Sequence, residues 1–450
     1  MKKKRFAVSI VSLCLVLAMT ACSATQPVMP EANPQDAAFP ASYVLAKATY
    51  PEMPDYPGID GSSADMDKWR QGVNAQHRDS TYADGLQPAM TAMMEQLLAD
   101  NGGENALCSP LNIYMALALL AECTDGDSRG QILQLLGSDS VDTLRQQAND
   151  LWNDTYRDDG IMQRVLASAL WLNEDLNFHQ EKLDLLAQQY YASSFRGKMG
   201  SREYDQALQD WLNSQTGGML KDQIGDLTMD PATVLALTTT VYFKAKWTSG
   251  GFAEENTAAG IFHGTAGDTE CEMMHSSYPM QYYWGDRFTA VASSFESGEM
   301  RFILPDEGCT PEDLLSDAQL AEFLMLPRSY NWENSKRIKV NRTIPKFDVG
   351  TQLKLKEDLQ TLGITAVFDS SKADFSAVTQ QPAYVSEATH GVRVKIDEKG
   401  CEAAAYTMMV APTAAPPPDE VVDFTLDRPF LFVVTNAAGL PLFAGIVNQL

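Results

Sequence analysis

Residues 398–418, which read EKGCEAAAYTMMVAPTAAPPP, fit neither a stable core element nor an ordinary surface loop. They follow a predicted strand, carry no charge from residue 403 to residue 418, and have side chains too small to build a core of their own. A hinge glycine, Gly400, opens the stretch, and three prolines at 416–418 close it. Because proline lacks the N–H that a ladder needs, strand pairing cannot extend past that end.

The same stretch has two unlike faces when it is read with the period of a strand. One face is small or apolar throughout and consists of Cys401, Ala403, Ala405, Thr407, Met409 and Ala411. The other face carries the charge and the large aromatic ring and consists of Glu402, Ala404, Tyr406, Met408 and Val410. The first face suits burial in a sheet, whereas the length and the prolines suit an exposed loop. We therefore expect a loop that can switch to a strand.

Helical signals fill the first part of the chain and strand signals the last part. Apolar residues recur at helical spacing, serines stand at N-cap positions, and a glycine pair stops one amphipathic stretch. Later, apolar residues alternate with polar ones, and two apolar runs flank a turn. These signals are Leu86, Met90, Met93 and Leu97; Ser109 before Pro110; Ser201 with Tyr204, Leu208, Trp211 and Leu212 before Gly217 and Gly218; Val392, Val394 and Ile396; and residues 430–434 and 440–447 around 436–439. This order predicts an α+β domain.

The N-terminus predicts an export signal over residues 1–21. Four basic residues precede an apolar run that is too short to span a membrane. The following residues resemble a bacterial lipoprotein signal, in which the thiol of Cys22 is lipidated and becomes the new N-terminus. Met19 stands where such signals usually have Leu or Val, so a soluble secreted product stays open. A lipid anchor would tether the folded part to the extracellular face of a bacterial envelope.

Three further segments follow the signal. Residues 22–40 are rich in Pro, Ala and polar residues and predict a flexible tether. Residues 41–80 are either an extended segment packed on the domain or more tether. Residues 81–450 contain no long low-complexity stretch and no repeat, and they predict one continuous domain.

The charge and the cysteines exclude several classes of protein. The net charge of -25 becomes -29 once residues 1–21, with four basic and no acidic residues, are removed. Such a surface repels phosphates, so we expect no nucleic-acid partner and no membrane contact except through the anchor. Five cysteines remain beyond Cys22: Cys108, Cys123, Cys271, Cys309 and Cys401. An odd, scattered set is no disulfide framework, and most of these residues should be small buried hydrophobes.

Motifs along nearly the whole chain from about residue 82 resemble the serpin family. The sequence EKGCEAAA at 398–405 is similar to the hinge of the reactive-centre loop of inhibitory serpins. The other motifs occur in the family's order. They are Asn105 with Ser109-Pro110, YFKAKW at 242–247, LPD at 304–306, IPKF at 344–347, LGI at 362–364 before Phe368-Asp369, ADFS at 373–376, His390, and RPFLF at 428–432.

The resemblance implies a serpin-like α+β fold, with a large mixed central sheet, smaller sheets and an exposed reactive-centre loop. It also implies a suicide-substrate mechanism. A serine protease cleaves the loop and forms an acyl-enzyme, the loop then inserts into the central sheet, and the trapped protease is distorted. The hinge would comprise Glu398, Gly400, Cys401, Glu402, Ala403, Ala404 and Ala405. Counting from the hinge places the reactive bond at Ala414-Ala415, with Ala411-Pro412 and Met409-Val410 as alternatives.

Small residues around the reactive bond suit elastase-like proteases, and no Arg or Lys lies between Lys399 and Arg428 for a trypsin-like enzyme. The resemblance also implies structural roles beneath and above the sheet opening for Ser109, Asn112, Thr239, Trp247 and His390. Asn112 and Thr239 depart from the serine and the asparagine that are common there. Cys401 replaces the usual threonine, and its thiol is open to modification.

The sequence also disfavours several partners and activities, and it leaves two alternative functions open. Acidic residues at 154–159 lie where heparin-binding serpins carry basic ones, so we expect no glycosaminoglycan, no other cofactor and a monomer. With five histidines, no GxSxG elbow and no HExxH spacing, an enzyme is disfavoured, and His390 is interpreted as a structural residue. The rivals are a non-inhibitory serpin-like binding protein or protease substrate, and a solute-binding lipoprotein.

Overall fold

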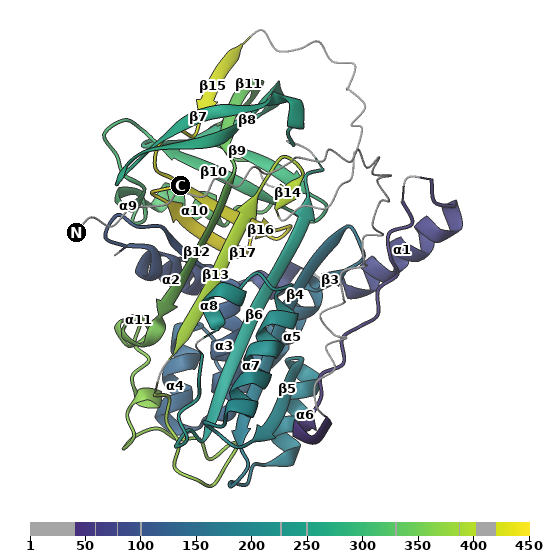
Figure 1. Cartoon of the computed structure of the whole chain (residues 1–450), viewed down its shortest axis with the longest axis vertical. Helices are drawn as coiled ribbons and strands as arrows, with labels where there is room; N and C mark the ends of the chain where they lie inside the picture. Colours follow the sequence, from purple (N-terminus) through teal and green to yellow (C-terminus); the bar gives the residue numbers. More distant parts are fainter. Residues whose placement is uncertain are drawn as a thin grey trace, which may run out of the picture.

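The computed structural model describes residues 41–58, 60–78, 80–99, 101–225, 227–248, 251–328, 331–386, 388–401 and 420–450. Two large sheets organise this part of the chain, with helices packed on both faces of the lower, central sheet (Figure 1). The result is an α+β fold with mixed sheets, as the order of sequence signals predicts.

Helices begin where the sequence places capping residues. The Ser109 hydroxyl accepts a hydrogen bond from the N–H of Asn112 at the start of α3, and Ser201 accepts one from Tyr204 at the start of α7. Helix α7 ends just before Gly217 and Gly218, whose φ angles of 57° and 81° lie in the left-handed region. The helices are α1 Ser63–Gln76, α2 Gln87–Ala99, α3 Pro110–Cys123, α4 Gly126–Leu135, α5 Val141–Thr155, α6 Gln180–Gln189, α7 Arg202–Gln215, α8 Lys221–Ile224, α9 Pro311–Leu314, α10 Ala318–Leu324 and α11 Leu355–Thr361.

The central sheet runs along the long axis of the molecule in the order β1-β5-β4-β6-β14-β13-β12, with β3 paired to β4 (Figure 1). Most of its pairs are antiparallel, but β4 and β5 are parallel. The strands are β1 Val44–Ala46, β3 Arg157–Asp158, β4 Met162–Asn173, β5 Ala192–Gly197, β6 Leu235–Lys246, β12 Phe347–Lys354, β13 Thr389–Ile396 and β14 Gly400–Cys401.

The second sheet has the order β15-β11-β8-β9-β10-β16-β17-β2, with β7 paired to β8. Its C-terminal hairpin, β16 and β17, is buried along its whole length, which confirms the hairpin that the two apolar runs predict. The strands are β2 Ala106–Cys108, β7 Thr257–Gly264, β8 Gly267–Trp284, β9 Phe288–Phe295, β10 Gly298–Pro305, β11 Ser335–Pro345, β15 Val421–Thr425, β16 Phe430–Asn436 and β17 Pro441–Val447.

The described residues that follow residue 41 pack on the domain. Strand β1 adds to the edge of the central sheet beside β5. The Tyr50 ring lies 5.1 Å from the ring of Trp152, centroid to centroid, and the Trp69 indole donates a hydrogen bond to Asp159 (3.0 Å). The side chain of Asp154 accepts hydrogen bonds from the N–H of Arg78 and from Tyr82. Two carboxylates of the acidic stretch 154–159 therefore hold this segment in place.

The five cysteines of the described chain are all free thiols, and Cys108, Cys123 and Cys401 are buried, as expected for small core residues. Within the described residues, no helix is both long enough and apolar enough to cross a bilayer.

Candidate functional site

The two residues of β14 lie between β6 and β13, in the middle of the central sheet. Gly400 pairs with Lys246, and Cys401 pairs with Ala245 on one side and with Ile396 on the other. A Cβ atom built on Gly400 would lie 2.1 Å from the carbonyl oxygen of Ala245, so only glycine fits at this point. The Cys401 side chain, 4% exposed, faces the core, where a small uncharged residue is required.

The turn that leads into β14 is held by Trp247, which follows β6. The backbone N–H of Trp247 donates to the carbonyl of Lys399 (3.1 Å), and its indole N–H donates to the carbonyl of Asp397 (3.0 Å). The Asp397 carboxylate accepts hydrogen bonds from the N–H groups of Lys399 and Gly400. The indole also stacks on Phe295 of the second sheet, with centroids 5.7 Å apart.

The Glu398 carboxylate anchors the same turn to the second sheet. Its Oε1 atom lies 2.8 Å from the Nζ of Lys346 and accepts a hydrogen bond from the Thr257 hydroxyl (2.6 Å). Burial raises the pKa of Glu398, but the hydrogen bonds from Lys346 and Thr257 outweigh this effect and bring the pKa below its usual value. The carboxylate is therefore charged at neutral pH and fixes the start of the hinge.

Below Cys401, the topology of the described residues joins β6 to β13 through β14 and by no other strand. The start of α3 and its N-cap Ser109, which pack on the core face, contact both strands there. The Asn112 amide donates to the carbonyl of Thr239 on β6 (3.4 Å), and the backbone N–H of Ser109 donates to Nε2 of His390 on β13 (2.9 Å). The Ser109 hydroxyl donates to the carbonyl of Leu442 (2.6 Å).

The protonation state of His390 follows from this geometry. A backbone N–H can only donate, so the Nε2 atom that accepts from Ser109 carries no proton. Burial lowers the pKa of His390 to about 4, because the charged imidazolium would lose its hydration. The residue is neutral at pH 7 and acts as a structural acceptor between β13 and α3.

A protein-family comparison identifies this arrangement. The family model described as "Serpin (serine protease inhibitor)" matches residues 89–450. The chain is a serpin. Its curated relatives include the leukocyte elastase inhibitor of Homo sapiens, which is 28% identical over 360 residues and is matched over 78% of this chain and 94% of its own length.

Solved serpin structures have the same fold. The native state of the thermophilic serpin tengpin superposes with a TM-score of 0.72 at 26% identity, covering 83% of this chain and 95% of tengpin. Human thyroxine-binding globulin, solved with its hormone, has a TM-score of 0.68 at 20% identity and covers 82% of this chain and 99% of its own. The serpin fold is therefore shared by a protein named as an inhibitor and by a protein named as a thyroxine-binding globulin.

The serpin structure brings together only some of the residues singled out from the sequence. Ser109, Asn112, Thr239 and His390 meet below β14. Gly400 and Cys401 form β14 itself, and Trp247 and Glu398 lie at the turn that leads into it. The remaining residues lie outside the described part of the chain: Glu402, Ala403, Ala404, Ala405, Ala414, Ala415 and Cys22.

Sequence reasoning missed the partners of the hinge. Lys346, which pairs with Glu398, belongs to the IPKF motif, but nothing local in that motif signals a contact with residue 398. Asp397 and Arg393 were also missed. For Arg393 a signal existed, because a charged residue within the alternating strand β13 marks a side chain that faces away from the core.

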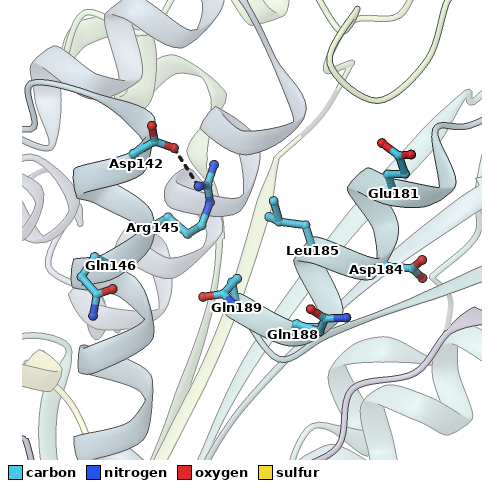
Figure 2. A pocket seen from close by; sticks show the side chains of 8 residues that line it. All are labelled: Asp142, Arg145, Gln146, Glu181, Asp184, Leu185, Gln188 and Gln189. Atoms are coloured by element: carbon cyan, nitrogen blue, oxygen red, sulfur yellow. Dashed lines mark hydrogen bonds and ion pairs between the residues drawn. The ribbon is translucent and has the colours of Figure 1, made fainter.

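A surface cavity of about 580 Å³ lies between α5 and α6, away from the hinge (Figure 2). Most of its lining is polar, and Arg145 there is already bound to Asp142 and to the buried carboxylate of Glu122. Lys182 and Tyr190 donate to the same carboxylate. These groups satisfy one another and join α3, α5 and α6, so we assign the cavity no ligand.

Proposed function

We propose that this serpin inhibits serine proteases by inserting residues 402–411 as a new strand between β6 and β13 after cleavage at Ala414-Ala415. The observation that carries the proposal is β14: the first two residues of such a strand, Gly400 and Cys401, already pair in the centre of the sheet. Insertion would continue an existing ladder rather than start a new one.

In the register of β14, the strand β6 would run out of pairing partners at the point where the first proline of the loop occurs. Gly400 pairs with Lys246, the last residue of β6, in an antiparallel ladder. The same register would bring residue 411 opposite Leu235, the first residue of β6. The next residue is Pro412, which lacks a ladder N–H. The chain thus has a strand-compatible sequence for as long as β6 offers partners.

The register also supports the two-faced reading of the loop. Cys401 faces the core, so the alternate residues down to Ala411, all small or apolar, would face the core too. Thr407 would come opposite both Thr239 and His390, the two residues that α3 contacts. The larger residues of the loop would project from the other face.

The energy available from insertion is large. An inserted strand that makes about a dozen ladder bonds at roughly 1 kcal/mol net each releases on the order of ten kcal/mol, before apolar burial is added. That exceeds the strength of most single contacts in a protease active site. The uncleaved form must then be metastable and held by a kinetic barrier.

The target and the location are part of the proposal. The residues Thr413, Ala414 and Ala415 suit the shallow pocket of an elastase-like protease, and the human relative is named an elastase inhibitor. The chain would act at the outside of a bacterial envelope, anchored through Cys22, as a monomer without cofactor.

The test is to mix the protein with an elastase-like serine protease and to separate the products in SDS. We expect a covalent complex of the summed mass and a released C-terminal fragment whose Edman sequence begins at Ala415. An Ala414→Asp variant is the matched control and should resist the same enzyme, because a carboxylate does not enter a shallow apolar pocket. Complete cleavage of the natural protein with full recovery of active protease would contradict inhibition and favour the substrate interpretation.

A further inference from the structure

The described chain enters the fold at the lower end of the central sheet, which is the end where β6 begins. Strand β1 lies on the edge of that sheet, where Val44 pairs with Phe195 of β5. In the same row, Phe195 pairs with Trp171 of β4, and Trp171 pairs with Ala236, the second residue of β6. Figure 1 shows β5 and α6 in the lower part of the molecule, and β14 and β15 in the upper part.

This entry point is fixed to the domain. The Tyr43 ring lies 5.3 Å from the ring of Tyr204 on α7, centroid to centroid. The backbone N–H of Ala48 donates a hydrogen bond to the hydroxyl of Ser193 on β5 (3.1 Å). The family model begins only at residue 89, so the family match does not account for this attachment.

The proposed inserted strand would end in the same row of the sheet. In the register that continues from Gly400, residue 410 would come opposite Ala236. The strands β5, β4 and β6 would then separate residue 410 from Val44, which makes four spacings of about 4.8 Å, or about 19 Å. Ala414 is the fourth residue after residue 410 and adds at most about 14 Å. Ala414 would therefore come to lie within about 33 Å of Val44.

The two described ends of the uncleaved loop lie at the opposite, upper end of the sheet. Cys401 is nine residues before residue 410, which corresponds to about 31 Å along a strand. On the other side of the loop, Glu420 precedes β15 in the upper part of the molecule (Figure 1). Insertion would thus carry a captured protease to the end of the sheet at which β1 attaches.

The proposed lipid anchor is connected to this lower end. Ala41 is the nineteenth residue after Cys22, so the chain between them spans at most about 68 Å when it is fully extended. A free chain of that length has an average end-to-end distance of about 24 Å. A globular protease of about 230 residues is about 45 Å across. The connection is therefore long enough for a protease to lie between the domain and a bilayer, but only when it is drawn out.

We propose that the lower end of the domain faces the membrane and that residues 23–40 are a spacer, long enough for a captured protease to fit beneath the domain. The spacer rests on the proposed function, because it requires both the insertion of the loop and the anchor at Cys22. In this orientation the uncleaved loop is presented away from the membrane, where soluble proteases approach. The captured enzyme is then held between the serpin and the bilayer.

The orientation can be measured by energy transfer on vesicles. The lipidated full chain is bound to phosphatidylcholine vesicles that contain a lipid with an acceptor dye on its headgroup, and an elastase-like protease carries the donor dye. Phosphatidylcholine has no net charge and therefore does not repel the acidic domain. A protease whose catalytic serine is replaced by alanine binds the uncleaved loop and reports the starting position. Transfer should be severalfold greater from the active protease in its covalent complex, and equal or lower transfer would overturn the orientation.

The length of the spacer is tested by deletion. Removal of residues 27–38 leaves seven residue steps between Cys22 and Ala41, which span at most about 25 Å, less than the diameter of the protease. On vesicles, several times more of this variant should be needed to inactivate one mole of protease, because slower insertion lets hydrolysis of the acyl-enzyme compete. Replacement of residues 27–38 by twelve Gly and Ser residues is the matched control. It keeps the length, so the natural stoichiometry should be kept as well.

The same deletion in a Cys22→Ser chain separates the spacer from the function on which it rests. This chain has no anchor, and in solution it should inhibit as well as the Cys22→Ser chain of full length. A deletion that leaves inhibition on vesicles unchanged, or that weakens it equally in solution, overturns the spacer alone. Natural protein that forms the covalent complex but does not bind vesicles overturns the anchor and the spacer. If the full-length Cys22→Ser chain forms no covalent complex in solution, the proposed inhibition and the spacer are both wrong.

Discussion

Under the proposed mechanism, a charged side chain at position 403 should convert this serpin from an inhibitor into a substrate. In a register that continued from Gly400 and Cys401, an inserted residue 403 would lie between Phe243 of β6 and Val394 of β13. These two side chains are 4% and 2% exposed, so an Ala403→Arg variant would have to bring a guanidinium into the core.

The size of the effect follows from this burial. An unpaired charge in a protein interior costs several kcal/mol even after relaxation. A penalty of about 4 kcal/mol on the transition state of insertion slows that step by about a thousandfold. Hydrolysis of the acyl-enzyme is unchanged, because the protease supplies its catalytic groups. Hydrolysis of the acyl-enzyme should therefore be much faster than insertion, and the protease should be released in its active form.

The assay is a titration that counts the moles of serpin needed to inactivate one mole of an elastase-like protease. About one mole of the natural protein should inactivate one mole of protease. Ala403→Arg should be needed in large molar excess, and SDS gels should show almost only cleaved serpin. Glu402→Arg is the matched control: it introduces the same side chain one residue earlier, on the face of Lys244 and the exposed Lys395, and should still inhibit. Equal stoichiometries for the two arginine variants would refute the register and the face assignment.

Two further predictions follow from single residues. Since the pKa of His390 is about 4 in the folded protein and near 6.5 in an unfolded chain, the unfolded state binds the proton first as the pH falls. The urea midpoint should therefore drop between pH 6.5 and pH 4, with a loss of up to about 3 kcal/mol in the free energy of unfolding. This drop should be missing in His390→Gln. If the midpoint depended on pH in the same way in both proteins, that result would contradict a buried neutral imidazole. The Cys22→Ser variant should appear in the culture medium and should not be labelled by radioactive palmitate in a bacterial host, whereas equal labelling of both chains would exclude Cys22 as the lipidation site.

Local chemistry explains what the sequence could predict. The caps Ser109 and Ser201 lie at helix starts because a side-chain oxygen next to a helix N-terminus has one dominant use, which is to accept from the free N–H groups. The alternation at 392–396 predicts a half-buried strand for the same reason: a period of two has no other common cause. Gly400 was expected to be a hinge, and the crowding against Ala245 gives the physical reason for a glycine there.

Non-local pairing could not be predicted in this way. The long strand β4 lies in the part of the chain where helical signals prevail, and it went unrecognised because a strand buried on both faces loses the alternation that marks a strand. The sequence left open whether Tyr50 belongs to a packed segment or to a tether, since its partner Trp152 lies about a hundred residues away and nothing near Tyr50 signals it. The bond from Arg393 to Met219 joins two segments 174 residues apart in the sequence.

The two paired residues of β14 also fix the register of any strand that continues from them. A shift of this register by one residue would turn every core-facing side chain outward. Ala414 is the thirteenth residue after Cys401. At about 3.4 Å for each residue of an extended strand, an enzyme bonded to Ala414 would come to lie about 44 Å from Cys401. The distance that a captured protease is carried would thus be set by the chain length after Cys401, before any protease arrives.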